Sequence, residues 1–430
     1  ACGMSFAVYP KHESYTDSGI DWIGQVPSSW SVEPGRQCLY ESKLKNIGMK
    51  ESTVLSLSYG RVIVKDEDKL TGLVPESFET YQVVQPGDII IRGTDLQNDM
   101  TSLRTGLARN TGIITSAYIN LRPKAEIDPK FLHYLLHSYD VKKVFYALGS
   151  GLRQNLSYED FKYLRLPIPN PEEQCAIAGF LDGKCAKIDE AVRIKEEQIK
   201  LLAERRQNLI QQAVTRGLNP DAPTKDSGID WIGRIPAHWE VKRFKYLFEQ
   251  SRLPVRPNDG VVTSFRDGQV TLRSNRRLEG FTEAIIEGGY QGIRVGQLVL
   301  NSMDAFEGAI GVSDSDGKCT PEYVICNPVQ DGLSQYYFAF LLREMALAKF
   351  IQVICNAVRQ RAVRIRFNNL AHRFMVVPTA DEQEEIVSFI NAVKEKIANA
   401  ISIKEDQIAA LKEYKTSLIN AAVTGKIKVI

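Results

Sequence analysis

Arginine-rich segments are the part of this sequence best suited to chemistry with another macromolecule. Residues 241–375 contain 18 lysine and arginine residues against 13 aspartate and glutamate residues. Arginine can donate two parallel hydrogen bonds to guanine in the major groove and can also pair with phosphates. We therefore predict DNA contact, with an ordinary solvated basic face as the alternative. The arginines gather in two clusters, Arg273, Arg276 and Arg277, then Arg359, Arg361, Arg364 and Arg366.

A related polar element occurs earlier in the chain. Arg153-Gln154-Asn155 matches Arg359-Gln360-Arg361 in position, because each precedes a long helix-forming run. Side chains of these types supply donors and acceptors for base edges and phosphates. The predicted DNA-binding residues are Arg92, Arg104, Arg109, Arg153, Gln154, Asn155, Arg273, Arg276, Arg277, Arg359, Gln360, Arg361 and Arg364.

Catalytic signatures are not found in the sequence. There is no Gly-x-x-x-x-Gly-Lys-[Ser/Thr] loop for nucleotide phosphates and no Asn-Pro-Pro-aromatic run typical of a DNA methyltransferase. His133 and His137 lie one helical turn apart but lack the third ligand of a zinc site, so we expect a structural role. Asp88, beside a strand, lacks the lysine that nuclease sites use. We therefore predict no catalytic and no metal-binding residues.

The composition limits the class of protein. A chain of 430 residues predicts two to four domains, and 43% hydrophobic and 25% charged residues are typical of a soluble protein. No apolar run approaches the roughly 18 residues of a membrane span, so no membrane partner is expected. Seven cysteines without a Cys-x-x-Cys pair, and no recognisable signal peptide, predict a cytoplasmic protein with reduced thiols. A net charge of +2 is too small to indicate DNA by itself.

Two long helix-forming runs, residues 172–216 and 381–425, are the elements expected to position the basic residues. Their apolar residues recur alternately four and three residues apart, which is the coiled-coil condition. Both runs place a cation at the same two seam positions, Lys195 with Lys404 and Arg206 with Lys415. Ordinary amphipathic helices in a globular core are the alternative. The predicted seam residues are Leu181, Ile188, Ile199, Leu202, Leu209, Ile397, Ile401, Ile408, Leu411 and Leu418.

The runs belong to a repeat that extends along the chain. The octapeptide Asp-Ser-Gly-Ile-Asp-Trp-Ile-Gly occurs at residues 17–24 and again, identically, 209 residues later. At the same offset, Glu173-Gln174 matches Glu382-Gln383. We expect Asp17 or Ser18 to cap a short helical turn in the first octapeptide. The chain is therefore a tandem duplication whose framework was retained while its inserts diverged.

Each insert is expected to be a compact α+β domain. Strands are predicted at residues 54–58, 61–64, 89–91 and 118–121, and helices at residues 131–148 and 333–354. We expect the two inserts to share one fold, since Val295-Gly296 follows Pro86-Gly87 at the repeat offset. The predicted fold class is α+β, with two similar domains (residues 12–165 and 220–375) separated by two long helices (residues 166–219 and 376–430) under pseudo-two-fold symmetry.

The connectivity predicts how such a chain would act on DNA. Each long helix leaves one insert and leads to the other, so the two helices should pack antiparallel. Some 40 helical residues span roughly 60 Å, which would separate two reading domains as in dimeric DNA readers. Because the inserts differ in sequence, the two half-sites should also differ.

The duplicated plan resembles the specificity subunit (HsdS) of type I restriction–modification systems over nearly the whole chain. The resemblance rests on Leu166-Pro167-Ile168-Pro169, on the Glu-Glu-Gln at residues 172–174, on the repeat, and on Asp-Trp-Ile-Gly with its following proline and tryptophan. The second helix lacks the Pro-x-Pro pair before it. The resemblance implies two target recognition domains, each reading half of a bipartite double-stranded DNA site, with the helices setting the gap.

The resemblance also implies partners. Two modification subunits would bind S-adenosylmethionine and methylate adenine, and restriction subunits would hydrolyse ATP with magnesium and cut DNA. The chain itself is then expected to bind no cofactor and to be no enzyme. The framework would have been retained because its repeated surfaces bind two copies of one partner. A coiled-coil scaffold whose inserts bind proteins is the alternative function, and a lone nuclease or methyltransferase is a third.

Overall fold

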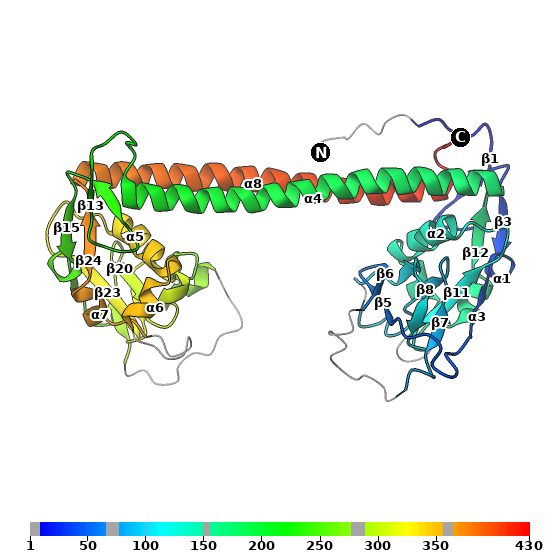
Figure 1. Cartoon of the computed structure of the whole chain (residues 1–430), viewed down its shortest axis with the longest axis horizontal. Coiled ribbons are helices and arrows are strands. Elements are labelled where there is room, and N and C mark those ends of the chain that lie inside the picture. Colours follow the sequence, from blue (N-terminus) through cyan, green and yellow to red (C-terminus); the bar gives the residue numbers. More distant parts are fainter. Residues whose placement is uncertain (1–8, 66–76, 100, 149–154, 277–288, 356–363) are drawn as a thin grey trace. The chain divides into compact units, whose positions relative to one another are not determined.

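A computed structural model describes residues 9–65, 77–99, 101–148, 155–276, 289–355 and 364–430. The chain divides into two compact units, of which unit 1 holds residues 1–195 with 405–430 and unit 2 holds residues 196–404. The boundaries fall inside two long helices, α4 (Pro171–Arg216) and α8 (Ala380–Val423) (Figure 1). The observed division thus differs from the predicted four segments, because the two halves of each long helix pack in different units.

Unit 1 is built on short antiparallel strands. Its four-stranded sheet has the order β4-β11-β8-β9. The three isoleucines of β8 are fully buried, as expected for a continuous apolar run in a central strand. The remaining strands pair as β1-β2, β3-β12, β5-β6 and β7-β10. The strands are β1 (Tyr15–Asp17), β2 (Gln25–Pro27), β3 (Ser31–Pro34), β4 (Leu39–Glu41), β5 (Leu55–Ser58), β6 (Arg61–Val64), β7 (Gln82–Val84), β8 (Ile89–Ile91), β9 (Thr105–Leu107), β10 (Gly112–Ile114), β11 (Ile119–Pro123) and β12 (Arg165–Ile168).

Unit 2 repeats this topology strand for strand. Its four-stranded sheet has the order β16-β23-β20-β21, and its pairs are β13-β14, β15-β24, β17-β18 and β19-β22. The predicted α+β fold class with two similar domains is therefore confirmed. The strands are β13 (Thr224–Asp226), β14 (Arg234–Pro236), β15 (Glu240–Arg243), β16 (Phe248–Gln250), β17 (Val262–Ser264), β18 (Val270–Leu272), β19 (Gln291–Ile293), β20 (Leu298–Asn301), β21 (Ile310–Val312), β22 (Gly317–Cys319), β23 (Tyr323–Pro328) and β24 (Phe374–Val377).

The helix predicted in each insert is interrupted. Helix α2 stops at Val141 and α5 at Leu347, and Lys143 and Lys349 then adopt left-handed backbone, with φ of 61° and 60°. A left-handed residue ends a helix, so the predictions of one continuous helix were wrong. The short helices are α1 (Gly35–Cys38), α2 (Pro129–Val141), η2 (Val144–Ala147), α3 (Tyr158–Lys162), η3 (Phe244–Tyr246), η4 (Arg273–Asn275), η5 (Ala305–Glu307), α5 (Gln335–Leu347), α6 (Phe350–Ile354) and α7 (Phe367–Ala371).

In both units the repeated octapeptide contains the expected helical turn. The Gly24 amide donates to the Ile20 carbonyl at 2.8 Å and the Gly233 amide to the Ile229 carbonyl at 2.9 Å, in each case four residues back along the chain. Asp17 accepts a hydrogen bond from the Gly19 amide at 2.9 Å, and Asp226 accepts one from the Gly228 amide at the same distance. Both glycines have positive φ (63° and 67°), which glycine adopts at little cost. The octapeptide is thus explained largely by its own backbone.

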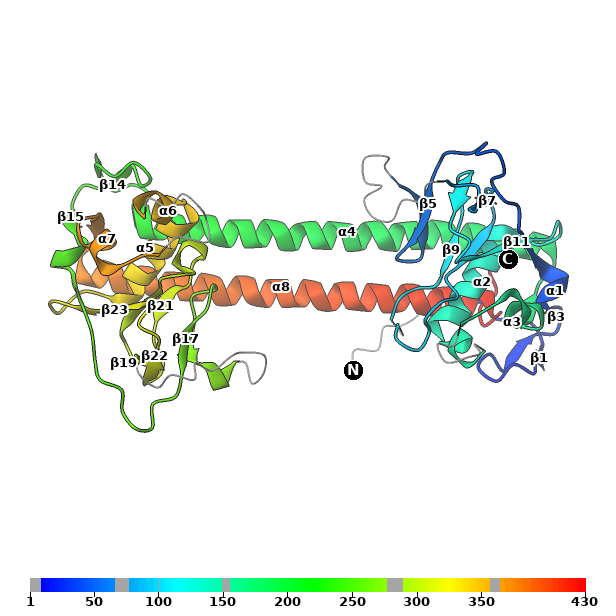
Figure 2. The same ribbon diagram turned by 90° about the horizontal axis from the view of Figure 1, so that it is seen from below.

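Within each unit, α4 and α8 lie side by side (Figure 1 and Figure 2). Lys195 donates to Gln407 in unit 1, and Lys404 donates to Gln198 in unit 2, both at 2.7 Å. Farther from these pairs, Lys415 meets Asp189 at 2.7 Å, so the helices run antiparallel. The seam residues lie as follows: Leu181, Ile188, Ile397, Ile408 and Leu418 are buried, and Ile199, Leu202, Leu209, Ile401 and Leu411 are partly buried.

A buried glutamine joins each long helix to the insert of its unit. The Gln174 side chain accepts from the Asp128 amide at 2.9 Å and donates to the Pro169 carbonyl at 2.9 Å. Gln383 repeats both contacts with Ser334 (2.8 Å) and Pro378 (3.0 Å). Asp128 and Ser334 are the N-cap residues of α2 and α5, so each glutamine fixes the start of a helix of the insert.

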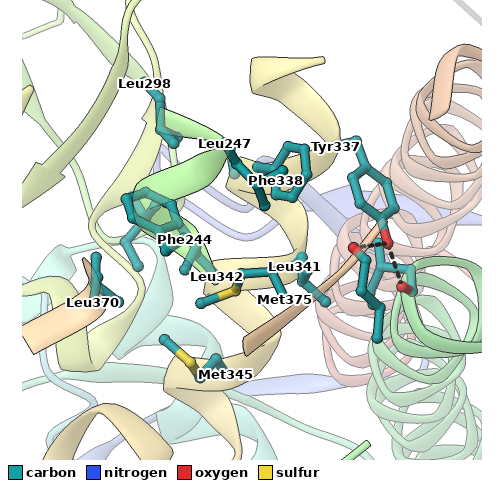
Figure 3. Close-up of a cluster of buried hydrophobic side chains, with 14 of the residues drawn as sticks. Phe244, Leu247, Leu298, Tyr337, Phe338, Leu341, Leu342, Met345, Leu370 and Met375 are labelled. Atoms are coloured by element: carbon teal, nitrogen blue, oxygen red, sulfur yellow. Dashed lines mark hydrogen bonds between the residues drawn. The ribbon is translucent and has the colours of Figure 1, made fainter. Parts of the chain in front are cut away.

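The core of unit 2 continues from the insert to the long helices. Aromatic and aliphatic side chains of α5, β20 and β24 interdigitate there (Figure 3). The Tyr337 hydroxyl lies 2.9 Å from the Val214 carbonyl of α4 and 3.4 Å from the Val376 carbonyl of β24. The insert of unit 2 therefore packs on α4 through both apolar and polar contacts.

Candidate DNA interface

Arg104 organises the loop between β8 and β9 in unit 1. Its side chain is fully buried and donates to the carbonyls of Arg92, Thr94, Asp95 and Asp99 at 2.5–3.3 Å, and to the Tyr146 hydroxyl at 3.1 Å. Since these bonds occupy the guanidinium, Arg104 stabilises the loop and has no face open to DNA. The prediction of DNA contact is corrected at this residue.

Arg92 and Asn155 lie beside the same loop. The Arg92 guanidinium pairs with Asp99 at 2.6 Å and its side chain is 33% exposed. Asn155 accepts from the Asp95 amide at 3.0 Å, and the next residue, Leu156, donates to the Gly93 carbonyl at 2.7 Å. Backbone amides, chiefly that of Ser102, together with Arg92, hold the pKa of Asp99 well below its usual range. Three predicted residues, from positions 92, 104 and 155, are therefore brought together.

Arg109 lies elsewhere in unit 1. It is exposed, after β9, and its charge acts on Asp182 of α4 and on His133 of α2. Burial lowers the pKa of His133 to about 3, and neighbouring positive charge adds to this effect. His133 is therefore a neutral structural histidine, as expected from the sequence.

In unit 2, Arg273 and Arg276 follow the β17-β18 hairpin. Arg273 donates to the Thr263 hydroxyl at 3.2 Å. Arg276 pairs with Asp267 at 2.6 Å and lies over the Phe265 ring, 4.2 Å from its centroid. The two predicted arginines thus share one small element, and Arg276 is exposed on it.

Arg364 occupies the position in unit 2 that Asn155 occupies in unit 1. The next residue, Ile365, donates its amide to the Ser302 carbonyl at 3.3 Å, next to the end of β20, as Leu156 does next to the end of β8. Arg364 is exposed and lies 3.7 Å from Glu322. The other predicted residues, Arg153, Gln154, Arg277, Arg359, Gln360 and Arg361, lie outside the described residues.

Sequence reasoning missed Arg343, which the fold places in α5 against the long helices. It stands nine residues after the N-cap Ser334, the same spacing that separates His137 from Asp128 in unit 1. Aligning the two inserts on these caps would have revealed that a histidine in one repeat is an arginine in the other. Within the described residues, no three His, Cys, Asp or Glu side chains are placed to hold a metal ion. None of the described helices is long and apolar enough to span a membrane.

Comparison with known proteins supports the resemblance. A family model described as "Type I restriction modification DNA specificity domain" matches residues 87–202. A putative type I restriction enzyme MjaX specificity subunit of Methanocaldococcus jannaschii is 24% identical over 53% of this chain and 56% of its own length. The type I restriction enzyme EcoBI specificity subunit of Escherichia coli is 23% identical over 83% of this chain and 76% of its own.

Solved structures with the same fold point the same way. A structure from a study of complex assembly and conformational transition of the type I R-M system matches with a TM-score of 0.67 at 15% identity, covering 94% of this chain and 99% of that one. The HsdS subunit of Thermoanaerobacter tengcongensis matches with a TM-score of 0.54 at 15% identity, over 94% and 98% of the two chains. In sequence and in fold, the chain is thus similar to the specificity subunits of type I restriction–modification systems.

Proposed function

We propose that this chain is the non-catalytic, cytoplasmic DNA-recognition subunit of a type I restriction–modification complex. Each recognition domain reads one half of an asymmetric, bipartite double-stranded site. One observation carries the proposal: the two units share a strand order and their framework contacts, while their basic residues differ. A shared frame with different side chains suits a single chain that reads two different half-sites.

The recognised site is testable in one experiment. We expect adenine methylation at a single split sequence when the chain is expressed with its modification subunit in a methylation-free host. Exchanging residues 244–375 for the corresponding segment of another family member should change one half-site and leave the other intact. Unchanged methylation after the exchange would contradict the proposal. The relatives are named as type I restriction enzyme specificity subunits, and the matching family model is described as a DNA specificity domain, which does not favour the protein-binding scaffold.

The repeated octapeptide supports a proposal about partners. Most of its residues serve the turn, but Asp21 and Asp230 are exposed at equivalent places in the two units. We propose that the surface around each aspartate binds one modification subunit, so that one chain binds two. S-adenosylmethionine, and any ATP and magnesium used by restriction subunits, would then be bound by the partners.

Stoichiometry tests this surface. Asp21→Arg and Asp230→Arg should each reduce the bound modification subunits from two to one by native mass spectrometry, and the double variant should bind none. Asp221→Arg, an exposed acid outside the repeated octapeptide, is the matched control and should still bind two. Two copies bound by the double variant would refute the assignment.

A further inference from the structure

In unit 2, one turn of α5 faces both long helices. Gln207 of α4 donates to the two carboxylate oxygens of Glu344 at 2.6 and 2.8 Å. The Lys394 ammonium of α8 lies 5.5 Å from the centroid of the Phe340 ring. Arg343 lies in the same turn of α5, between the two contacts. Three helices therefore converge around residues 340–344.

Three cations meet at this convergence: Arg206 of α4, Arg343 of α5 and Lys394 of α8. Burial lowers the pKa of Lys394, and the charges of Arg343 and Arg206 lower it further. Arg343 donates through Nη1 to the carbonyls of Gly308 (2.7 Å) and Arg266 (3.4 Å). In the described part of the chain, neither its Nη2 nor the Arg206 guanidinium has a hydrogen-bond acceptor. The cluster therefore retains unused donors.

The nearby acids offset the three cations only in part. The charge of Asp267 acts on Arg343 and Lys394, but its carboxylate also pairs with Arg276 at 2.6 Å. Burial raises the pKa of Glu344 to about 7, so its carboxyl is only partly charged at neutral pH. Like charges that act on one another repel, and they are stabilised when an anion binds among them.

Unit 1 provides an internal comparison, because at the equivalent place the cation of α8 is paired with a carboxylate, which also lies 3.7 Å from the exposed Arg61. The counterpart of Arg206 is Lys415, whose ammonium meets both oxygens of Asp189 at 2.7 and 2.8 Å. At the repeat offset of 209, Asp189 of unit 1 corresponds to Ala398 of unit 2, so the carboxylate is missing there. Lys394 of unit 2 corresponds to Cys185 of unit 1, so this cation is missing in unit 1. The counterpart of Arg343 is His137, whose pKa is lowered by burial to about 4, so it is uncharged. Among the described residues, the carboxylate that pairs with the α8 cation in unit 1 therefore has no counterpart at the same position in unit 2.

The cluster is continuous with the candidate DNA interface of unit 2. The β17-β18 hairpin touches Arg343 through the Arg266 carbonyl and carries Phe265, under the Arg276 guanidinium. We propose that Arg206, Arg343 and Lys394 bind a backbone phosphate of the DNA read by unit 2. The inference rests on the proposed function, because it takes DNA to be the ligand. Arginine and lysine from three rigid helices would set the position of the duplex without reading its bases.

The test uses the chain in complex with its modification subunits and a duplex carrying the site found by methylation profiling. Arg206→Gln with Lys394→Gln should weaken binding about fivefold near 0.15 M salt and reduce the slope of log affinity against log salt by about 1 to 2. The methylated sequence should not change. Arg206→Lys with Lys394→Arg, which keeps the charges, should bind as the wild type does.

Lys195→Gln with Lys404→Gln is the matched control, because these ammoniums lie on the same helices but already bond to glutamines. It should leave the salt slope unchanged. An unchanged slope in the Arg206/Lys394 variant, while the wild-type complex binds DNA, would overturn the phosphate contact alone. A change in the methylated sequence of this variant would also overturn it. The same holds if the wild-type complex binds inorganic phosphate in calorimetry while the Arg206/Lys394 variant binds DNA as tightly as the wild type. A wild-type complex that fails to bind any DNA would instead contradict the proposed function.

Discussion

Arg104 illustrates at the residue scale why an arginine is not by itself a DNA contact. The guanidinium has five donors in a fixed plane, and in this fold they bond to carbonyls of one loop and to the Tyr146 hydroxyl. Arg109 has the same chemistry, but its side chain is exposed and remains a predicted DNA contact.

Replacing Arg104 should therefore affect folding more than recognition. We expect Arg104→Met to destabilise unit 1 by about 3 kcal/mol, because several buried carbonyls lose their donors. Urea unfolding followed by tyrosine and tryptophan fluorescence measures this change. The exposed Arg109→Ala control should change stability by less than about 0.5 kcal/mol. If the Arg104→Met protein were as stable as the wild type and lost only DNA binding, Arg104 would be a DNA contact, as the sequence predicted.

The two histidines of α2 give unit 1 a predicted response to acid. Burial lowers the pKa of His133 to about 3 and that of His137 to about 4, below the ordinary value of 6.5. Below pH 6.5 the histidines of the unfolded chain therefore bind protons, while those of the folded unit stay neutral. The free energy of unfolding of unit 1 decreases as the pH is lowered. Between pH 7.5 and 5, His133→Leu should lose about 2 kcal/mol less stability than the wild type. Equal losses in thermal unfolding would contradict this account.

At the scale of elements, each recognition-domain helix is joined to a long helix by one glutamine. Gln174→Ala should leave the Asp128 amide and the Pro169 carbonyl without partners and destabilise unit 1 by about 2 kcal/mol. Hydrogen exchange at the start of α2 should accelerate, with no change at the start of α5. Gln383→Ala should produce the reverse pattern. Gln198→Ala, which removes an exposed contact with Lys404, is the control and should change neither. If one substitution accelerated hydrogen exchange at the starts of both α2 and α5, each glutamine could not be acting only on the helix it contacts.

The helix breaks are a second property of elements. Lys349 is exposed and has left-handed backbone, a conformation that costs a non-glycine residue about 1 kcal/mol. Lys349→Gly should stabilise unit 2 by about 0.5–1 kcal/mol in urea unfolding, after the added freedom of the unfolded chain is included. Lys143→Gly should stabilise unit 1 by less, because the Lys143 ammonium lies 4.8 Å from the centroid of the Tyr146 ring and the substitution removes this contact. Destabilisation at Lys349 would show that its side chain has another role.

At the scale of the molecule, the two long helices are the only segments that lead from one unit to the other. If the proposed function is correct, their length sets the gap in the DNA site. Deleting one heptad from each, residues 193–199 and 402–408, removes about 10 Å of helix, or about three base pairs of DNA. Methylation profiling should find the same half-sites separated by a gap shorter by about three base pairs. A change in the bases read, with the gap unchanged, would refute the role of the helices.

The sequence by itself determined the properties that depend on local pattern or on internal comparison. The 4-3 spacing along residues 172–216 and 381–425 depends on neighbours one turn away, and helices α4 and α8 match it within two residues. The β5, β6 and β8 strands follow apolar runs bounded by turns and were also predicted. The two-fold repeat needed only an offset of 209 residues. The helices and strands could be predicted because backbone propensity and hydrophobic periodicity depend on residues only a few positions apart.

Tertiary structure decided which of the predicted side chains are available to a ligand. Arg104 is buried because Tyr146 and the loop at residues 92–99 close around it, and no local pattern encodes that contact. Arg206 and Lys394 lie 188 residues apart in sequence and face one turn of α5 only because two helices pack antiparallel beneath it. Exposure and charge balance depend on which distant groups meet, and that is settled by packing.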